Sequence, residues 1–313
     1  MGWISHGIRA QGRCRSSLPI EGVVLLISII IPAYNEASVI ARCLQALLQD
    51  DRPGELEILV VCNGCSDDTA QVARGFGPSV RVIETKVPSK TSALNLGDSS
   101  ANGFPRIYMD ADVVVSRDSV RRVAAVLEDG SHLAAAPRPV DVFLPETSWV
   151  VRAYYRFWGA LPYIQEGMIA AGVYALSQRG RERFGEFPDL IADDGYVRLQ
   201  FQPHERIQVS AATSSVVAPT SMAHLLKIRT RSRLGHMQLG QRYPDLTQRE
   251  SRTKRYGLAL LSVARRPSLY PAAFAYAYVT LASWLRARRK LAETANYVWE
   301  RDDSSRVAEA GKP

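Results

Sequence analysis

Strand-like and helix-like patterns alternate four times between Val23 and Leu127, and this alternation limits the possible folds more than any other feature. Residues 23–31 are almost all β-branched or leucine, as expected for a central parallel strand that is covered on both faces. Further strand patterns cover residues 56–62, 80–84 and 107–109, and a helical pattern follows each of them. The chain is therefore predicted to form an α/β domain with a mainly parallel central sheet and flanking helices.

A cluster of polar residues follows each predicted strand. In open α/β sheets, ligands bind beyond the carboxyl ends of the strands, so these clusters are expected to line one edge. No G-x-G-x-x-G follows the first strand, which disfavours a dinucleotide-binding domain of the usual kind. The four clusters are Tyr34-Asn35-Glu36, residues 63–68, residues 84–90 and Asp110-Ala111-Asp112.

Asp110-Ala111-Asp112 places two carboxylates one residue apart where a buried strand ends. In a continuing strand they would share one face about 6.6 Å apart. Such an oxygen-rich, anionic site suits Mg²⁺ or Mn²⁺ holding phosphates. The alternative is a turn in which both carboxylates are solvated or cap the next helix. A second acidic pair, Asp193-Asp194, has the same alternative interpretation as a helix cap.

The composition is that of an ordinary globular protein, because 46% of the residues are hydrophobic and 22% are charged. The net charge of +8 suits an anionic partner, such as a nucleotide, a nucleic acid or an anionic membrane. Aromatic residues are not interleaved with the basic cluster at residues 227–233, which disfavours nucleic-acid binding. The four cysteines are interpreted as reduced thiols rather than as half of a zinc site at residues 62–65.

Three regions are predicted along the chain: a loose basic leader over residues 1–22, a catalytic domain over 23–245, and a helical region with a polar tail over 246–313. Within the last region, residues 269–285 are apolar, but they are at the lower length limit for a membrane span. Basic residues flank them on both sides, which favours a helix lying on an anionic membrane surface. The alternative is a buried core helix.

Five motifs in order resemble those of the family 2 glycosyltransferases with the A-type glycosyltransferase fold, over residues 24–235. The motifs are Ile31-Pro32-Ala33-Tyr34-Asn35-Glu36, residues 60–69, residues 89–97, Asp110-Ala111-Asp112 and Asp193-Asp194. The resemblance implies a Rossmann-like fold and inverting transfer of a sugar from a nucleoside diphosphate sugar to an acceptor hydroxyl. It also implies synthesis of a cell-envelope or exopolysaccharide glycan, or of a glycolipid. The implied place is the cytoplasmic face of the bacterial inner membrane, or the cytoplasm.

The resemblance also assigns roles to single residues. Asp112 is expected to ligate Mg²⁺ or Mn²⁺, and Asp110 to contact the metal or the ribose. Asp194 is expected to act as the base, with Asp193 raising its pKa. Lys90 is expected to contact phosphate or the Asp110 carboxylate. Nucleotide-sugar contacts are assigned to Pro32, Ala33, Tyr34, Glu36, Asn63, Asp67, Lys90, Asp110, Ala111, Arg229, Arg231 and Arg233.

A few positions need separate interpretation. Arg229, Arg231 and Arg233 could instead form a solvated or membrane-facing basic surface. Gly172 lies at the start of a strand pattern, where a glycine lets another group approach the backbone, and it is assigned to acceptor binding. The family commonly has Asp where this chain has Asn63, which could change the preference among nucleotide bases.

Single transfer is expected, because the Q-x-x-R-W of the processive polysaccharide synthases is missing from residues 228–232. The expected donor is a UDP-sugar and the acceptor is a glycan or a lipid-linked molecule. Two alternatives stay open: a catalytically degenerate nucleotide-sugar-binding protein at the membrane, and a nucleotidyltransferase. The second should carry a glycine-rich basic loop after the first strand, where this chain has Pro32-Ala33-Tyr34-Asn35-Glu36.

Overall fold

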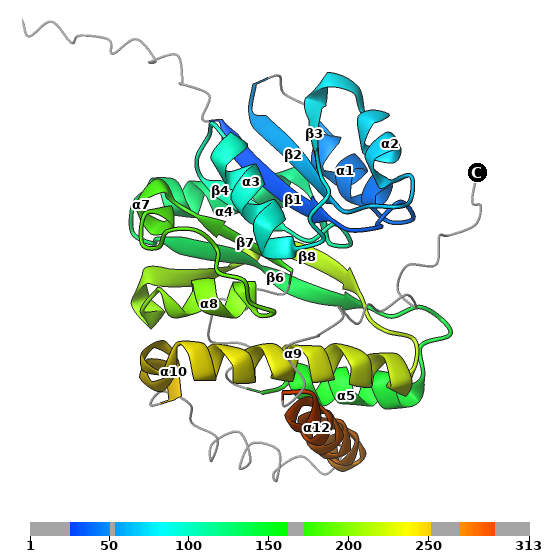
Figure 1. Cartoon of the computed structure of the whole chain (residues 1–313). Helices are drawn as coiled ribbons and strands as arrows, with labels where there is room; N and C mark the ends of the chain where they lie inside the picture. The colour runs from blue at the N-terminus through cyan, green and yellow to red at the C-terminus, as the bar shows by residue number, and fades with distance from the viewer. Residues whose placement is uncertain (1–25, 51–53, 162–171, 252–268, 292–313) are drawn as a thin grey trace, which may run out of the picture.

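The computed structural model describes residues 26–50, 54–161, 172–251 and 269–291 (Figure 1). Within these ranges, eight strands form one sheet in the order β3-β2-β1-β4-β7-β6-β8-β5. The strands are β1 (Ile27–Ala33), β2 (Leu56–Asn63), β3 (Val80–Thr85), β4 (Arg106–Met109), β5 (Val114–Val115), β6 (Ala134–Val142), β7 (Val173–Leu176) and β8 (Arg206–Val217). The α/β class predicted from the sequence is confirmed.

The first four predicted strands form the parallel half of the sheet. β1 lies between β2 and β4 and is parallel to both, with Ile30 opposite Leu59 and Tyr108. Every residue of β1 is buried, which explains its unbroken apolar sequence. Helices α1 (Ile40–Leu48), α2 (Thr69–Arg74) and α4 (Arg117–Glu128) pack in one core cluster with the side chains of Ile29 and Ile31. Helix α3 (Lys90–Ser100) covers the opposite face.

The second half makes the sheet mixed rather than mainly parallel throughout. β7 is antiparallel to both β4 and β6, and β5 is antiparallel to β8. β6 and β8 are parallel, and their register shifts between Pro137 and Arg138. The short helical elements around this half are α7 (Gln178–Arg181), α8 (Asp193–Leu199) and η2 (Pro203–Glu205), whereas η1 (Gly77–Ser79) precedes β3 in the parallel half.

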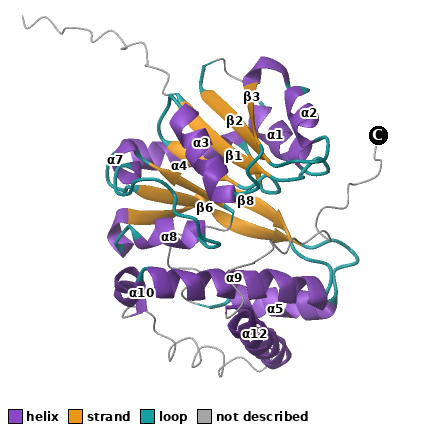
Figure 2. Cartoon of the chain, viewed as in Figure 1, coloured by secondary structure: helices purple, strands orange, loops and turns teal. Residues whose placement is uncertain are grey.

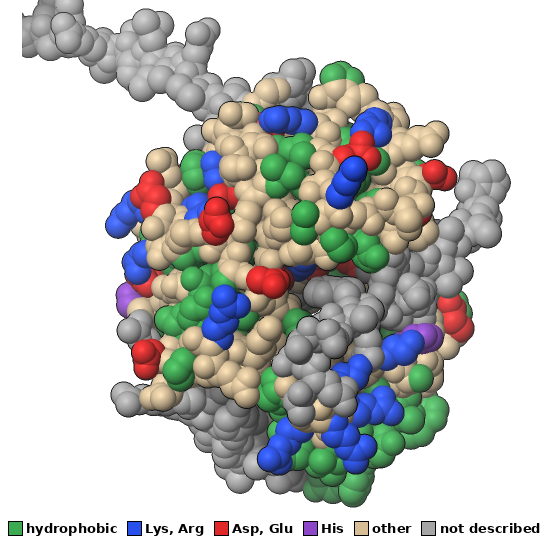
Figure 3. Space-filling model, in the orientation of Figure 1, with side chains coloured by type: hydrophobic (Ala, Val, Ile, Leu, Met, Phe, Trp, Pro, Cys, Tyr) green, Lys and Arg blue, Asp and Glu red, His purple; other side chains and the backbone are tan. Residues whose placement is uncertain are grey.

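A separate layer of helices lies beside the sheet (Figure 2). Helices α5 (Trp149–Gly159), α9 (Met222–Arg242) and α12 (Tyr270–Leu291) pack against one another, and α10 (Pro244–Ser251) follows α9. Tyr154, Leu225 and Val279 form the buried centre of this layer. Lys and Arg side chains gather over it, next to hydrophobic side chains (Figure 3).

The predicted terminal regions are only partly described. The leader at residues 1–22 lies outside the described residues, and the division into three regions stays a prediction. Of residues 246–313, the described parts belong to α10 and α12 or lie directly beside them. None of the helices in the described ranges is both long enough and apolar enough to cross a membrane.

Candidate active site

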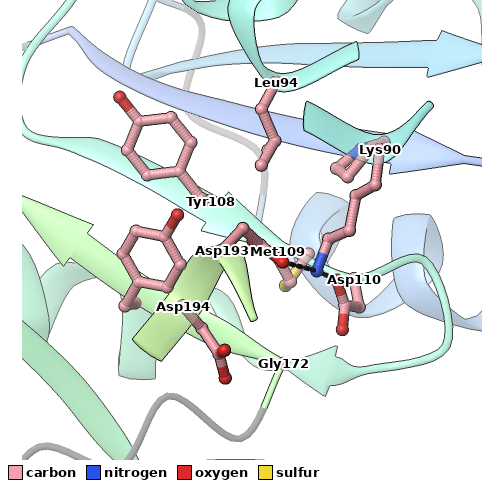
Figure 4. Close-up of a pocket in the computed structure, with 10 residues that line it drawn as sticks. Lys90, Leu94, Tyr108, Met109, Asp110, Gly172, Asp193 and Asp194 are labelled. Carbon is pink, nitrogen blue, oxygen red and sulfur yellow. Dashed lines mark ion pairs between the residues drawn. The ribbon is translucent and has the colours of Figure 1, made fainter. Parts of the chain in front are cut away.

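A small pocket lies where β1 and β4 end and where α3 and α8 begin (Figure 4). The lining residues come from segments far apart in the sequence, which the parallel strands bring to one edge. They are Pro32, Lys90, Leu94, Tyr108, Met109, Asp110, Gly172, Tyr174, Asp193 and Asp194.

Lys90 joins the two acidic motifs. Ser89 caps α3, because its side-chain oxygen accepts a hydrogen bond from the Ser92 N–H at 3.3 Å, so Lys90 stands in the first helical turn. Its Nζ lies 2.7 Å from Oδ1 of Asp110 and 3.2 Å from Oδ1 of Asp193 (Figure 4). Contact between Lys90 and Asp110 was one of the two expected from the sequence. The contact with Asp193 was not expected.

Burial shifts the protonation of the second acidic pair. Asp193 is 3% exposed, and its Oδ2 has no hydrogen-bond partner among the described residues. Burial raises the pKa of Asp193 to about 6, although Lys90 opposes the shift. Burial also raises the pKa of Asp194, against the opposing effects of Lys90 and of the Gly195 N–H, which donates to Oδ1 of Asp194 at 2.7 Å. Both carboxyls therefore hold a proton more readily than ordinary aspartates do.

The pKa of Lys90 is also raised, but by the neighbouring charges and not by burial. Burial alone would lower the pKa of Lys90, but the charges of Asp110, Asp193 and Asp194 outweigh burial and raise it. The pocket thus contains a firmly protonated ammonium among three carboxyl groups.

Asp110 and Asp112 lie in a turn and not in a continuing strand. β4 ends at Met109, and the Val113 N–H donates to the Asp110 carbonyl at 3.1 Å. The two carboxylates therefore do not share one face of a continuing strand, and that interpretation of the motif is wrong. Asp110 lines the pocket and Asp112 does not. The backbone carbonyl of Asp112 accepts a hydrogen bond from the Arg42 side chain at 3.4 Å.

The acidic residues fit a metal that is shared with a ligand. Within the described ranges, no three His, Cys, Asp or Glu side chains gather closely enough to hold a metal by themselves. Mg²⁺ in phosphate-binding sites is usually held by one or two carboxylates, together with water and the phosphates. The hard oxygens of Asp110 and Asp112 suit that arrangement, whereas a closed protein cage would need further ligands.

Gly172 lies directly against Asp110. It has a positive φ of 74°, and its carbonyl accepts a hydrogen bond from the Asp110 N–H at 2.7 Å. A Cβ at this position would lie 2.7 Å from Cγ2 of Val113 and 3.2 Å from Oδ2 of Asp110. The expected close approach to the backbone is present, and the groups that approach are Asp110 and Val113. A role in acceptor binding stays a prediction.

The turns that follow β1 and β2 are bound to each other. The Glu36 N–H donates to Oγ1 of Thr69 at 2.7 Å, and the Ala37 N–H donates to Oδ2 of Asp67 at 3.1 Å. The Ser66 N–H donates to Oδ1 of Asn35, also at 2.7 Å. These bonds bring together the two motifs that were assigned to the nucleotide.

The side chains in these turns differ in exposure. Glu36 and Asn63 are buried, whereas Tyr34 is 38% exposed and could offer its ring to a base. Cys65 contributes to the joint between the turns, because its Sγ donates to the Ala33 carbonyl at 3.2 Å. Contact of Ala33, Tyr34, Glu36, Asn63, Asp67 and Ala111 with a nucleotide stays a prediction.

The basic residues of α9 are placed away from the pocket. The Arg229 guanidinium lies over the rings of Tyr154, Tyr155 and Trp158, at 5.1, 5.4 and 4.7 Å from their centroids. Nε of Arg233 donates to Oγ of Ser283 in α12 at 2.9 Å. Neither these two residues nor Arg231 lines the pocket. For Arg229 to contact phosphate, it would have to leave its aromatic surroundings.

Sequence reasoning missed the aromatic wall of the pocket. Tyr108 and Tyr174 stack with their centroids 5.1 Å apart. The Tyr108 hydroxyl donates to Asp98, whose carboxylate also binds Arg106 and Arg181. The Tyr174 hydroxyl is buried and has no hydrogen-bond partner among the described residues. The available signal was an aromatic residue in the apolar strand pattern, two positions before Asp110.

Residues 28–175, just under half of the chain, match the family model described as Glycosyl transferase family 2. Glycosyltransferase AglE of Haloferax volcanii is 35% identical over 91 residues, which cover 28% of this chain and 30% of that protein. The match thus spans less than a third of this relative's length.

Two solved structures show the same fold. A mannosyltransferase from Pyrobaculum calidifontis in complex with GDP-Man and Mn²⁺ has a TM-score of 0.59 at 21% identity, covering 86% of this chain and 88% of that one. Glucosyl-3-phosphoglycerate synthase from Mycobacterium tuberculosis, in complex with Mn²⁺, UDP-Glc and phosphoglyceric acid, has a TM-score of 0.51 at 18% identity. It covers 70% of this chain and 79% of that one. The expected A-type glycosyltransferase fold is confirmed.

Proposed function

We propose that this chain is an inverting, metal-dependent glycosyltransferase that moves a sugar from a nucleoside diphosphate sugar to an acceptor hydroxyl. The observation that carries the proposal is the pocket in which Lys90 joins Asp110 to Asp193, with Asp194 beside them. Because the pocket lies at the carboxyl edge of β1 and β4, it stands where an α/β sheet binds its ligand. The family of residues 28–175 supports the same reaction class.

The donor would lie along the linked turns after β1 and β2. Tyr34, Glu36, Asn63 and Asp67 would contact the base and the ribose. The two solved relatives hold GDP-Man and UDP-Glc, so both nucleotides are candidates. We retain a UDP-sugar as the first candidate.

Asp110 and Asp112 would hold Mg²⁺ or Mn²⁺ against the diphosphate. The ion would neutralise the negative charge that the leaving diphosphate acquires. Lys90 adds a fixed positive charge next to Asp110. In the donor complex, its ammonium would be within reach of a phosphate oxygen while it still balances Asp193.

Asp194 would act as the base. It would take the proton of the acceptor hydroxyl as that oxygen bonds to the anomeric carbon, while the bond from this carbon to the diphosphate breaks on the opposite face. The pKa of Asp194 is raised by burial, which makes its carboxylate a better proton acceptor than an exposed aspartate. The Tyr174 hydroxyl and Oδ2 of Asp193, which have no hydrogen-bond partner within the described part of the chain, would bind hydroxyl groups of the donor sugar.

The acceptor would be a glycan or a lipid-linked molecule in cell-envelope or exopolysaccharide synthesis, at the cytoplasmic face of the bacterial inner membrane. One sugar would be added per encounter, because residues 228–232 lack the Q-x-x-R-W of processive synthases. The support for this step is the resemblance to the family together with the basic, partly apolar helical layer.

A thermal-shift screen of UDP-, GDP- and dTDP-sugars, with and without Mn²⁺, tests the donor part of the proposal. Ligands that bind only the folded state raise the melting temperature. We expect one nucleotide class to stabilise the protein, and Mn²⁺ to increase the shift in wild type but not in Asp110→Asn. Equal, metal-independent shifts with every nucleotide would contradict the assigned role of the acidic motif.

An activity assay with the donor that binds tests the catalytic part of the proposal. Release of nucleoside diphosphate, with transfer to added acceptor or slow hydrolysis, separates an enzyme from a degenerate binding protein. A nucleotidyltransferase would instead release pyrophosphate from a nucleoside triphosphate and a sugar phosphate, and that outcome would overturn the proposal.

A further inference from the structure

Helix α12 packs on the protein with its small residues. Ala272, Ala275, Val279, Ser283 and Ala287 are buried, and they recur every three or four positions, so they form one face of the helix. This face contacts α5 and α9. In an ordinary surface helix the large apolar residues point inward to the core. Here the side that faces the protein is made mostly of small residues, and the Tyr276 ring packs there on Tyr154 and Phe157.

Most of the large apolar residues of α12 point away from the protein. They are between 36% and 77% exposed, and their spacing places them along the side opposite the packed face. We call this surface the α12 apolar face, made of Tyr270, Phe274, Tyr278, Leu281, Trp284 and Leu285. Soluble monomers rarely expose so many large apolar side chains together, and such patches mark interaction surfaces.

The charge next to the α12 apolar face is of one sign. The helix contains no Asp or Glu between Tyr270 and Leu291. Three exposed arginines, Arg286, Arg288 and Arg289, stand near its C-terminal end. The Arg288 guanidinium lies 4.9 Å from the centroid of the Trp284 ring, so the apolar and the basic parts are continuous. Lys and Arg side chains are grouped over this layer in the space-filling view (Figure 3).

We propose that the α12 apolar face lies in the surface of an anionic lipid bilayer, with the helix parallel to the membrane plane. The rings and leucines would enter the boundary between headgroups and acyl chains, while the arginines would reach anionic headgroups. A protein partner would also cover apolar residues, but a bilayer additionally explains the aromatic residues, the arginines and the absence of acidic residues in this helix. This deepens the membrane location given in the proposed function, by naming the surface that makes the contact.

Vesicle flotation with the full chain tests the proposal without any sugar donor, so its failure would leave the transferase proposal untouched. We expect binding to vesicles of phosphatidylcholine with phosphatidylglycerol, weaker binding to phosphatidylcholine alone, and release by salt. Phe274→Glu/Leu281→Glu should abolish flotation. Arg286→Gln/Arg288→Gln should weaken binding to the anionic vesicles by roughly 30-fold, since each cation near such a surface contributes about fivefold.

Matched controls separate this surface from general charge and folding effects. Lys86→Gln/Arg179→Gln removes two exposed cations outside the helical layer and should float like wild type. Because Phe274 and Leu281 are exposed, their variants should keep the wild-type melting temperature. The proposal is overturned if wild type does not float with anionic vesicles, or if the Glu variant still does. It is also overturned if wild type is a dimer in light scattering and Phe274→Glu/Leu281→Glu is a monomer, because the face would then join two copies.

Discussion

The backbone of Gly172 lies against the side chain of Asp110, so closely that a Cβ on Gly172 would be 3.2 Å from Oδ2 of Asp110. The same carboxylate binds Lys90 through Oδ1. The position of Asp110 therefore depends on Gly172, the residue just before β7. β7 is distant from Asp110 in the sequence and comes to the site through antiparallel pairing with β4.

Gly172→Ala should move Asp110 and impair transfer. The new methyl group would meet Cγ2 of Val113 at 2.7 Å as well as the Asp110 carboxylate. Small displacements of reacting groups can cost about 100-fold in rate, and overpacking typically costs about 1–3 kcal/mol of stability. We expect a loss of that size in sugar transfer, together with a lower free energy of unfolding.

Gly130→Ala is the matched control for backbone strain. Gly130 has the same φ of 74°, but nothing lies within 4 Å of its Cβ position. Gly130→Ala should lower the free energy of unfolding only by the roughly 1–2 kcal/mol that a residue with a side chain costs in the left-handed region. Its transfer activity per folded molecule should stay at the wild-type level. Equal effects of the two variants on activity would show that contact with Asp110 is irrelevant.

Lys90→Met should reduce transfer by at least about 100-fold, the usual cost of removing one electrostatic donor from an active site. Without the ammonium, Asp110 and Asp193 lose their shared cation, and the pKa of Asp193 and that of the base Asp194, both of which Lys90 lowers, should rise further. The acid limb of the pH–rate profile should therefore move to higher pH. Lys86→Met, at an exposed lysine in the segment before α3, should leave both readouts unchanged.

Asp194→Asn should bind the nucleotide sugar and fail to transfer it, with a loss of about 10²–10⁴-fold in kcat. Because burial raises the pKa of Asp194, wild-type activity should already fall at a pH above the ordinary range of aspartate, and the residual activity of the variant should lack that decline. Isothermal titration checks donor binding. Asp189→Asn, at an exposed acid just before α8, is the control. Transfer near the wild-type rate by Asp194→Asn would remove Asp194 from the mechanism.

Tyr174→Phe separates a ligand-binding hydroxyl from a structural one. The Tyr174 hydroxyl is buried without a described partner, so its removal should not lower the melting temperature of the free protein. If it binds the donor sugar, donor affinity should fall by about tenfold. Tyr108→Phe is the contrasting variant: its hydroxyl donates to Asp98, and its loss should destabilise the free protein. Unchanged donor affinity in Tyr174→Phe would mean that this hydroxyl does not contact the sugar.

The parallel half of the fold could be predicted because its signals are local. β1, β2 and β4 are apolar runs buried on both faces, and each ends in a turn with polar residues. The mixed half lacks such signals. β6 contains Pro137 and Pro139, and β8 is rich in serine and threonine, so neither looks like a strand until long-range pairing with β7 and β6 fixes it.

Several residues that line the candidate site could be predicted from the sequence, but their geometry could not. Motif order identified Lys90, Asp110 and Asp193, yet only the folded chain shows that one ammonium contacts both carboxylates. The turn at Asp110 depends on the Val113 N–H and on β5, a two-residue strand with almost no pattern of its own. The family resemblance assigned Arg229 to the nucleotide sugar, and no local pattern indicated that aromatic rings from α5 surround its guanidinium.

Glu55→Gln tests the electrostatics of the fold away from the pocket. Arg121 and Arg117 donate to the Glu55 carboxylate at 2.6 and 2.8 Å. The hydrogen bond from Arg121, together with that from Arg117, outweighs burial and lowers the pKa of Glu55 to about 2. A carboxyl whose pKa is lower in the folded state stabilises the protein above its unfolded pKa, and this stabilisation is lost as the pH falls through the folded pKa. Because solvent screens this partly exposed site, the lowered pKa corresponds to roughly 1–2 kcal/mol at pH 7.

Urea unfolding of wild type and Glu55→Gln should therefore differ by about that amount at neutral pH, and by roughly half or less at pH 3. Transfer activity per folded molecule should not change, because Glu55 does not line the pocket. Glu128→Gln removes an exposed carboxylate at the end of α4 and should alter stability by less than about 0.5 kcal/mol at either pH. A difference between wild type and Glu55→Gln that stays constant from pH 7 to pH 3 would show that the two arginines do not hold Glu55 ionised. In that case the link from the start of β2 to α4 would rest on packing alone.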